Sequence, residues 1–412
     1  MLKISYMFLR RMSQKLWVRV GLFALLSVLT LPLAIFVERF LPRDVATLFD
    51  KQAVMPVLQI LASSMLTVST FSLGIMVSAH RAAAGQATPR VHRILIRDTT
   101  TQTVIATFIG AFVYSLSAIM MFQADLYGEG APVVVMGITL LIVGLMTVAM
   151  LRWIAHLSEL GSMDATMEAT TRLAAQSLYR FHQSPALGGT PMNGDTVWPE
   201  NLTALPAPKS GFLQAIDAVA LDKQCATPGN MVYVAQRPGK LVLAGEPLAR
   251  ISGQVTPEMM VAMTRAFVIG AKRTYDQDAA FGLLVLSETA SRALSPGIND
   301  PGTAIEALTE LEKLLWDFSR KDPAEPPRCP RIFVPELGDE ALIDSAFAAI
   351  ARDGASQIEV AIHLQKALKQ LARCGRDDLS AAATAMSELA MAHANAALRL
   401  DAEKERLQKH AL

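Results

Sequence analysis

Four long apolar runs dominate the first 154 residues of the chain, and each is long enough to cross a bilayer. A membrane-spanning helix needs about 20 consecutive residues that are mainly apolar. The runs predict spans at about residues 17–37, 53–79, 101–122 and 131–154. The sequence therefore predicts an integral membrane protein that contacts the lipid bilayer through a four-helix transmembrane domain, residues 1–155.

The second predicted span differs from the others because small polar residues recur along it. They are spaced three or four positions apart, which places their side chains on one face of a helix. This face, the polar stripe, comprises Gln59, Ser63, Thr67, Thr70, Gly74 and Ser78. Hydroxyl groups gain nothing from lipid tails, so we expect the stripe to meet other helices or a water-filled path. In the second case, Ser63 to Ser78 of the stripe would line a pore.

The third predicted span carries a weaker set of the same kind. Its members are Thr103, Thr107, Gly110, Tyr114 and Ser117. Two helices with small polar faces could pack on each other or line one path, and the spacing does not separate these alternatives. No acidic or basic residue lies in the middle of a span, which argues against a proton relay or a charged-substrate site within the membrane.

Basic residues between the spans predict the orientation. The segment after the second span carries Arg81, Arg90, Arg93 and Arg97. The segment between the third and fourth spans has Asp125 and Glu129 but no Lys or Arg. Cytoplasmic segments are richer in basic residues, so both termini are predicted to lie in the cytoplasm. A signal peptide also begins with basic residues, but the first apolar run is long for one and three more spans follow.

The chain after the fourth span predicts a cytoplasmic α+β domain, and the whole chain is mostly α. Residues 156–183 keep a helical pattern but become polar, as a helical extension of the fourth span would. Residues 184–209 are rich in Pro and Gly and predict a linker. Short strands separated by turn residues predict a β-module over residues 210–255. Residues 256–412 predict a helical domain, with Asp300 as an N-cap before a proline.

The β-module contains a hairpin-like segment, residues 237–251, that resembles half of the barrel-sandwich found in lipoyl and biotinyl carrier domains. Those carriers present a modified lysine on an exposed hairpin, usually beside Asp or Met. Neither Lys240 nor Lys223 has such a setting. We therefore expect a structural module that carries no cofactor.

Composition narrows the classes of function. The net charge of +1 gives no field that would attract nucleic acid. Cys225, Cys329 and Cys374 are far apart and show no zinc or disulfide spacing, and the seven histidines show no ligand spacing. Motifs for phosphate loops, dinucleotide folds, zinc proteases and serine hydrolases are missing from the sequence. We expect neither a metal site nor an enzyme.

The densest polar stretch of the chain runs from residue 273 to 301. It contains Arg273, Asp276, Asp278, Arg292, Ser295, Asn299 and Asp300. These residues could form an ion-pair and capping network that positions helices, or a ligand site built on loops. The first interpretation is favoured, because neither a nucleophile–base pair nor a metal-ligand pattern stands out.

The same stretch resembles a known family. The run Arg-Thr-x-x-Gln-Asp-x-x-Phe-Gly at residues 273–282 and the run Arg-Ala-Leu-Ser-Pro-Gly-Ile-Asn-Asp-Pro at 292–301 are similar to bacterial predicted membrane proteins of domain of unknown function 2254. The polar stripe, residues 210–217 and residues 237–251 fit the same family. The resemblance implies an inner-membrane location and the same layout of spans and cytoplasmic domain, but it implies no activity and no site residues.

Two functions remain in competition. The leading hypothesis is a homo-oligomeric inner-membrane pore for ions, in which the second span of each subunit lines the path and the cytoplasmic domain gates or assembles it. Four spans are few for a transporter built from internal repeats but enough for such a channel. The alternative is a membrane-anchored scaffold or sensor that conducts nothing and binds a partner or ligand.

Overall fold

The computed structural model divides into two compact units, each described here by itself. The apolar unit comprises Leu2–Gly85 and His92–Ala165, and the α+β unit comprises Met1, Gln86–Val91 and Thr166–Leu412. The residues that the structure describes are 48–86, 90, 99–127, 130–157, 162–193, 199, 201–225, 229–320 and 326–412, with Val18, Gly21, Leu25, Leu29, Pro32, Phe36 and Val37.

Three long helices form the described part of the apolar unit. They are α4 (Lys51–Gln86), α6 (Thr99–Gln123) and α7 (Ala131–Leu157). Each contains a section long and apolar enough to cross a membrane: Lys51–Ala79, Gln102–Gln123 and Ala131–His156. These sections agree with the second, third and fourth predicted spans. The predicted first span, residues 17–37, lies outside the described residues apart from scattered positions and stays a prediction.

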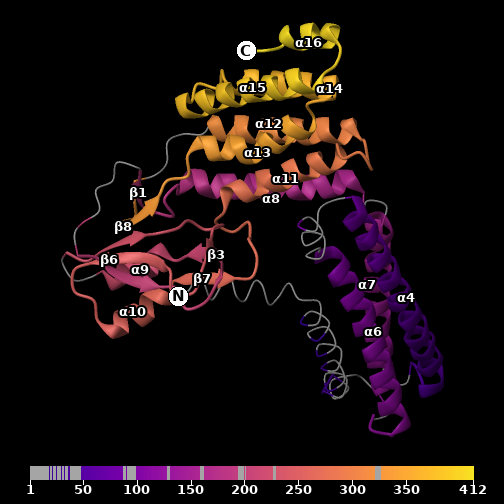
Figure 1. Ribbon diagram of the computed structural model, residues 1–412. Coiled ribbons are helices and arrows are strands. Elements are labelled where there is room, and N and C mark those ends of the chain that lie inside the picture. Colours follow the sequence, from indigo (N-terminus) through magenta and orange to yellow (C-terminus); the bar gives the residue numbers. More distant parts are fainter. Residues whose placement is uncertain are drawn as a thin grey trace. The chain divides into compact units, whose positions relative to one another are not determined.

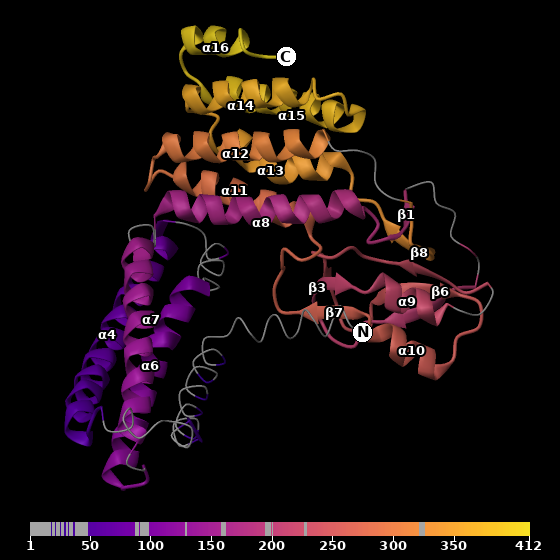
Figure 2. The ribbon, with the colours of Figure 1, turned by 180° about the vertical axis from the view of Figure 1, so that it is seen from behind.

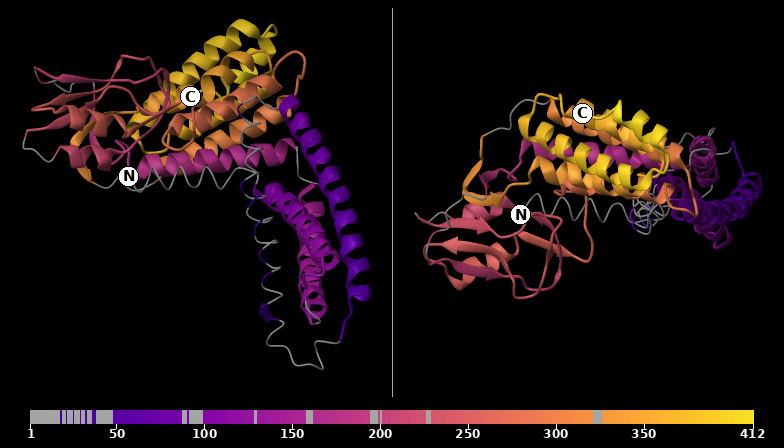
Figure 3. Two further views of the ribbon diagram at one scale, coloured as in Figure 1. Left: turned by 90° about the horizontal axis from the view of Figure 1, so that it is seen from below. Right: turned by 45° about the horizontal axis from the view of Figure 1, so that its top comes forward.

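Helices α4, α6 and α7 run side by side (Figures 1 and 3) and share two apolar clusters along their length. One cluster joins Leu58 of α4 to Tyr114 of α6 and Val135 of α7. The hydroxyl of Tyr114 donates to the carbonyl oxygen of Val135 at 3.1 Å, so this buried polar group is satisfied within the unit. The second cluster joins Met65 of α4 to Phe108 of α6 and Trp153 of α7. One face of α4 is therefore committed to packing on its two neighbours.

The α+β unit has a layered bundle of helices. They are α8 (Met163–Gln183), α11 (Ala279–Ala293), α12 (Pro301–Ser319), α13 (Asp339–Asp353), α14 (Ile358–Leu371), α15 (Asp377–Ala397) and α16 (Asp401–Gln408). Figures 1 and 2 show α8 with α11, then α12 with α13, then α14 with α15, and α16 beyond them. Apolar side chains from α8 and from α11 to α15 form one continuous core.

Helix α8 covers most of the predicted polar extension of the fourth span. The structure describes α7 as far as Leu157 and α8 from Met163. Met167, Ala174 and Leu178 of α8 are buried in the core of the bundle. A Cβ atom on Gly282 would lie 2.5 Å from that of Ala174, so glycine allows the close approach of α11 to α8. Amphipathic packing, not a membrane, therefore accounts for the polar face of this helix.

The strands of the α+β unit form two sheets. Their bounds are β1 (Gly189–Met192), β2 (Thr203–Pro206), β3 (Gly211–Ile216), β4 (Met231–Val234), β5 (Leu241–Val242), β6 (Pro247–Ser252), β7 (Phe267–Gly270) and β8 (Cys329–Pro335), with short helices α9 (Ala218–Gln224) and α10 (Pro257–Thr264) among them. The five-stranded sheet has the order β1-β8-β4-β6-β2 and the three-stranded sheet β5-β3-β7. In Figure 3 the sheets lie together with α9 and α10 at one end of the helical bundle.

Two expectations about this region are wrong. The predicted linker, residues 184–209, contributes β1 and β2 to the five-stranded sheet. The predicted helical domain contributes β7 and β8, and β8 pairs in parallel between β1 and β4. The strands of residues 210–255 occur where predicted, but they are divided between two sheets, so the barrel-sandwich resemblance is not confirmed. Strands brought together from distant segments cannot be inferred from local turn signals.

Candidate functional site

The structure places the polar stripe on the face of α4 that is opposite to its packed face. A helix has about 3.6 residues per turn, so Leu58, Leu61 and Met65 share the face that contacts α6 and α7. The side chains of Ser63 and Thr67 lie on the far side and are exposed within the described chain. The stripe therefore does not serve packing among the three described helices of its own unit.

The hydroxyl groups of the stripe bond to the backbone of their own helix. The Oγ atom of Ser63 donates to the carbonyl oxygen of Gln59 at 2.9 Å, and Oγ1 of Thr67 donates to that of Ser63 at 3.1 Å. Thr70 does the same with Leu66 at 2.6 Å. Because these three hydroxyl hydrogens are used in the helix, the oxygen lone pairs remain as the polar groups that these side chains present on the surface. The middle of the stripe, from Ser63 to Thr70, thus presents uncharged hydrogen-bond acceptors.

Exposed apolar side chains flank the stripe on both sides. Leu66 and Leu73 lie along one edge, and Ile60 and Phe71 lie along the other. Helix α4 therefore has three surfaces: a face packed on α6 and α7, apolar flanks, and the polar stripe between the flanks. A helix that faced only lipid on its exposed side would not need the third surface.

The weaker set on the third predicted span does not match the stripe. Gly110 and Tyr114 are buried within α6, and Tyr114 bonds to α7. Thr103 is exposed and Thr107 is half-buried. Packing between helices accounts for Gly110 and Tyr114 of this set.

The polar stretch from residue 273 to 301 is not one site, because α11 separates its two parts. Arg273, Asp276 and Asp278 precede the first residue of α11, whereas Arg292 to Asp300 lie at its far end. Fifteen helical residues hold the parts about 22 Å apart. The sequence stretch is continuous, but the structure makes two local networks from it.

The first network is centred on Asp278, whose side chain is 6% exposed. Arg273 donates to both carboxylate oxygens, at 2.8 Å from Nε and 3.0 Å from Nη2. Burial raises the pKa of Asp278, and the pairing with Arg273 opposes this rise. Gly239 lies against the carboxylate, and Ser177 of α8 donates to the backbone oxygen of Asp278 at 3.0 Å. The contacts join α8, α11 and the turn before β5, which fits the structural interpretation.

The second network closes the turn between α11 and α12. The carboxylate of Asp300 accepts from the N–H of Thr303 at 3.1 Å and from its hydroxyl at 2.6 Å, as predicted for an N-cap. These bonds lower the pKa of Asp300. Ser295 donates to the carbonyl of Arg292 at 2.6 Å, and Gln357 donates to Asn299 at 3.2 Å. Each bond is of a kind that holds a turn or a helix end.

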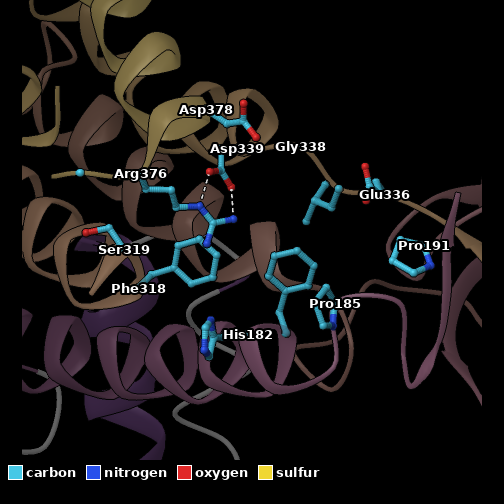
Figure 4. Close-up of a pocket in the computed structure, with 13 residues that line it drawn as sticks. His182, Pro185, Pro191, Phe318, Ser319, Glu336, Gly338, Asp339, Arg376 and Asp378 are labelled. Atoms are coloured by element: carbon cyan, nitrogen blue, oxygen red, sulfur yellow. Dashed lines mark hydrogen bonds and ion pairs between the residues drawn. The ribbon is translucent and has the colours of Figure 1, made fainter. Parts of the chain in front are cut away.

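A third feature, a pocket in the α+β unit with a volume of about 490 Å³, was not predicted from the sequence. Five segments line it: the end of α8, strand β1, the end of α12, the turn before α13 and the turn before α15 (Figure 4). Their lining residues include Phe181, His182, Phe318, Glu336, Leu337, Asp339, Arg376 and Asp378. Four of these segments are ordinary helix termini in sequence and the fifth is a short strand, and only the fold brings the five together.

An arginine–carboxylate pair forms one wall of this pocket (Figure 4). Arg376 donates to Asp339 at 2.5 Å from Nε and 2.9 Å from Nη2, and the Asp339 side chain is 2% exposed. The Arg376 guanidinium lies 4.6 Å from the centre of the Phe318 ring, which stacks on Phe181 at 5.9 Å. Arg237 in turn lies 5.4 Å from the Phe181 ring. This row of stacked groups ties α15, α12 and α8 to the turn before β5.

No group of three or more His, Cys, Asp or Glu side chains that could hold a metal ion occurs within the part of the chain that the structure describes. The three cysteines are buried thiols that form no disulfide, and burial raises the pKa of Cys225 to about 11. A thiol with a raised pKa is a poor nucleophile. These residues therefore add no chemistry to the three features above.

A family comparison identifies the chain. The model of the family described as predicted membrane protein DUF2254 matches residues 13–370. The chain belongs to this family. The match covers the apolar unit and most of the α+β unit, including both polar networks, and agrees with the three apolar helices.

The curated relatives of this DUF2254 protein are uncharacterized proteins from Mycobacterium bovis and Mycobacterium tuberculosis. Each is 25% identical over 262 residues, which are 62% of this chain and 50% of the relative. The chain thus spans about half the length of the curated relatives it matches. No solved structure matches significantly.

Proposed function

We propose that this DUF2254 protein is a homo-oligomeric ion-conducting pore of the bacterial inner membrane, with both termini in the cytoplasm. Helix α4 of each copy would face a common axis, and the α+β unit would assemble or gate the pore. The observation that carries the proposal is the position of the polar stripe on α4, opposite the face packed on α6 and α7.

Assembly around α4 would give the hydroxyl groups of the stripe polar neighbours from other copies. Around a symmetry axis, the same positions of neighbouring copies lie at the same depth, so Ser63, Thr67 and Thr70 would form stacked rings. The apolar flanks at Leu66 and Phe71 would then contact neighbouring copies or lipid. Neither α6 nor α7, the other two long helices described in the apolar unit, covers the stripe, and assembly would account for both its polar centre and its apolar edges.

The chemistry of the stripe supports cations over anions. The hydroxyl hydrogens are bonded to backbone carbonyls, so oxygen lone pairs would replace part of the hydration shell of a passing cation. No charged side chain lies in the stripe, so discrimination among monovalent cations would be weak. The Asp339–Arg376 pair and the other charged networks lie in the α+β unit and play no part in selectivity here.

Ion flux through proteoliposomes tests the proposal. Replacing Thr67 with Val keeps the shape but removes the acceptor oxygen, and replacing it with Phe narrows and dries the path. We expect Thr67→Val to reduce potassium flux and Thr67→Phe to abolish it. Thr147→Val on α7 is the matched control, because Thr147 is also exposed and donates to its own helix, at 2.9 Å to Val143. Equal effects at Thr67 and Thr147, or a protein that remains monomeric, would contradict the pore.

The pocket of the α+β unit favours a second candidate function, a membrane-anchored sensor that conducts nothing. A cavity of about 490 Å³ lies within the range of small-molecule sites. On this view the stripe would serve contact between helices only. A purified protein that binds a small ligand but passes no ions under voltage, membrane tension or pH change would establish the sensor in place of the pore.

A further inference from the structure

The pocket has the size and the mixed lining of a small-molecule site. Its volume of about 490 Å³ suits a ligand of roughly a dozen or more heavy atoms. Phe181, Phe318 and Leu337 supply the apolar part of the lining, while Glu336, Asp339 and Asp378 supply carboxylates (Figure 4). The chemical class of the ligand therefore depends on which charges remain available.

The positive charge of Arg376 is already paired with the Asp339 carboxylate. Its guanidinium makes a bidentate pair with Asp339 and lies over the Phe318 ring. Glu336 and Asp378 are both exposed, and neither forms an ion pair with another described residue. Arg237 does not line the pocket; it is 8% exposed, donates to the carbonyl oxygens of Pro185 and Pro335, and offsets part of the charge of Glu336. The pocket surface thus has an excess of negative charge.

Two helix N-termini face the pocket, yet they do not favour an anion. Helices α13 and α15 begin at its wall, and such ends attract negative groups. The first turns of these helices already contain Asp339, Asp377 and Asp378. These side chains compensate the helix dipoles, so an incoming phosphate or carboxylate would meet repulsion instead.

The buried carboxylate of Asp339 adds a specific acceptor. An ionised carboxylate offers about four acceptor positions, and Arg376 fills two of them. Asp339 lines the pocket while its side chain is 2% exposed, so the remaining positions are shielded from bulk water. A hydrogen-bond donor on a ligand would satisfy them.

We propose that this pocket binds a small organic cation, an amine with an apolar or aromatic body. The ammonium group would lie between Glu336 and Asp378, with Asp339 as a further acceptor. The apolar body would contact Leu337 and the edges of the Phe181 and Phe318 rings. The pocket would bind such a ligand whether or not α4 lines a pore.

Calorimetry on the full-length protein in detergent tests the ligand class with isosteric probes. Phenethylamine should bind and raise the melting temperature, while 3-phenylpropionate, of similar shape but opposite charge, should do neither. Binding of phenethylamine should weaken as salt rises, because the carboxylates at the pocket are partly exposed. Tighter binding of the anion, or no binding of phenethylamine, spermidine or benzylamine at millimolar concentration, would overturn the proposal.

Two adjacent aspartates provide a matched test of the site. Asp378 lines the pocket and Asp377 does not, although both are exposed in the first turn of α15. Asp378→Asn and Glu336→Gln should each raise the Kd for phenethylamine by about threefold to fivefold. Asp377→Asn should leave the Kd unchanged.

The melting temperature without ligand shows whether each variant is folded, and Ser319→Trp, which fills the pocket wall, is a second route to loss of binding. Equal effects of Asp377→Asn and Asp378→Asn would place the amine elsewhere. If magnesium ions compete with phenethylamine for binding, the pocket is a metal-ion site and the organic-cation proposal is wrong.

Discussion

The polar stripe of the apolar unit and the Asp278 network of the α+β unit use polar groups in opposite ways. In the apolar unit, Thr67 and Thr70 lie on an exposed face and bond only to their own helix. In the α+β unit, Asp278 is buried and its partners come from three separate elements. A polar group that satisfies itself locally can change without loss of the fold, whereas one that joins distant elements cannot. Substitutions should therefore spare the fold at the stripe and destabilise it at Asp278.

The largest effect is expected at Asp278. Asp278→Ala leaves Arg273 beside an apolar site without its partner, and we expect a loss of about 3 kcal/mol in the free energy of unfolding of the α+β unit. The value lies at the lower end for a buried pair because Arg273 is 24% exposed and regains some water. Thermal melting measures it. Arg172→Ala, which breaks the exposed Glu168–Arg172 pair of α8, is the control and should change little.

A substitution at Gly239 should also disrupt the Asp278 network. A Cβ on Gly239 would lie 2.2 Å from Oδ2 of Asp278, and the residue has φ of +99°. Gly245 has φ of +87° with no atom within 4 Å of such a Cβ, so Gly245→Ala measures the backbone strain alone, about 1–2 kcal/mol. Gly239→Ala should destabilise more than Gly245→Ala. Equal melting temperatures would mean that Asp278 moves aside at no cost.

An intermediate effect is expected at Asp300. Asp300→Ala removes the cap of α12 and should cost about 0.5–2 kcal/mol. Because the bonds to Thr303 lower the pKa of Asp300 in the folded protein, its contribution is present at neutral pH and is lost as the pH falls through the unfolded pKa, about 3.9, towards the lower folded value. The difference in stability between wild type and Asp300→Ala should shrink in acid. A stability difference that does not depend on pH would show that the ionised Asp300 carboxylate does not stabilise the helix end.

The smallest effect on stability is expected at Thr67. This prediction tests the contrast between the stripe and the Asp278 network. Thr67→Val removes one hydrogen bond within α4 and no contact with α6 or α7, so the melting temperature should shift by no more than the equivalent of about 0.5 kcal/mol. Ion flux should nevertheless fall. A large loss of stability in Thr67→Val would show that the stripe stabilises the fold, as the Asp278 network does.

The apolar periodicity of residues 53–154 was enough to locate three helices and the face of α4 that carries the stripe. Period and length are local properties, and a helix places residues three or four apart on one face whatever surrounds it. The Asp300 cap and the strands of residues 210–255 were also readable, because caps and turns depend on neighbouring residues. The pairing of β8 between β1 and β4 could not be predicted, because residues 100 and 140 positions apart are paired in it, as Val232 is with Ile332 and Gly189 with Cys329.

The candidate sites divide along the same line. Sequence alone determined the polar stripe, the apolar spans and the presence of a polar motif at residues 273–301. Only the tertiary structure decided that α11 splits this motif into two networks and that Phe181, Phe318, Asp339 and Arg376 share one pocket. Hydrophobic periodicity indicates which face of a single helix or strand is buried. A pocket forms where the ends of several elements come together, and a local sequence pattern does not specify which elements these are.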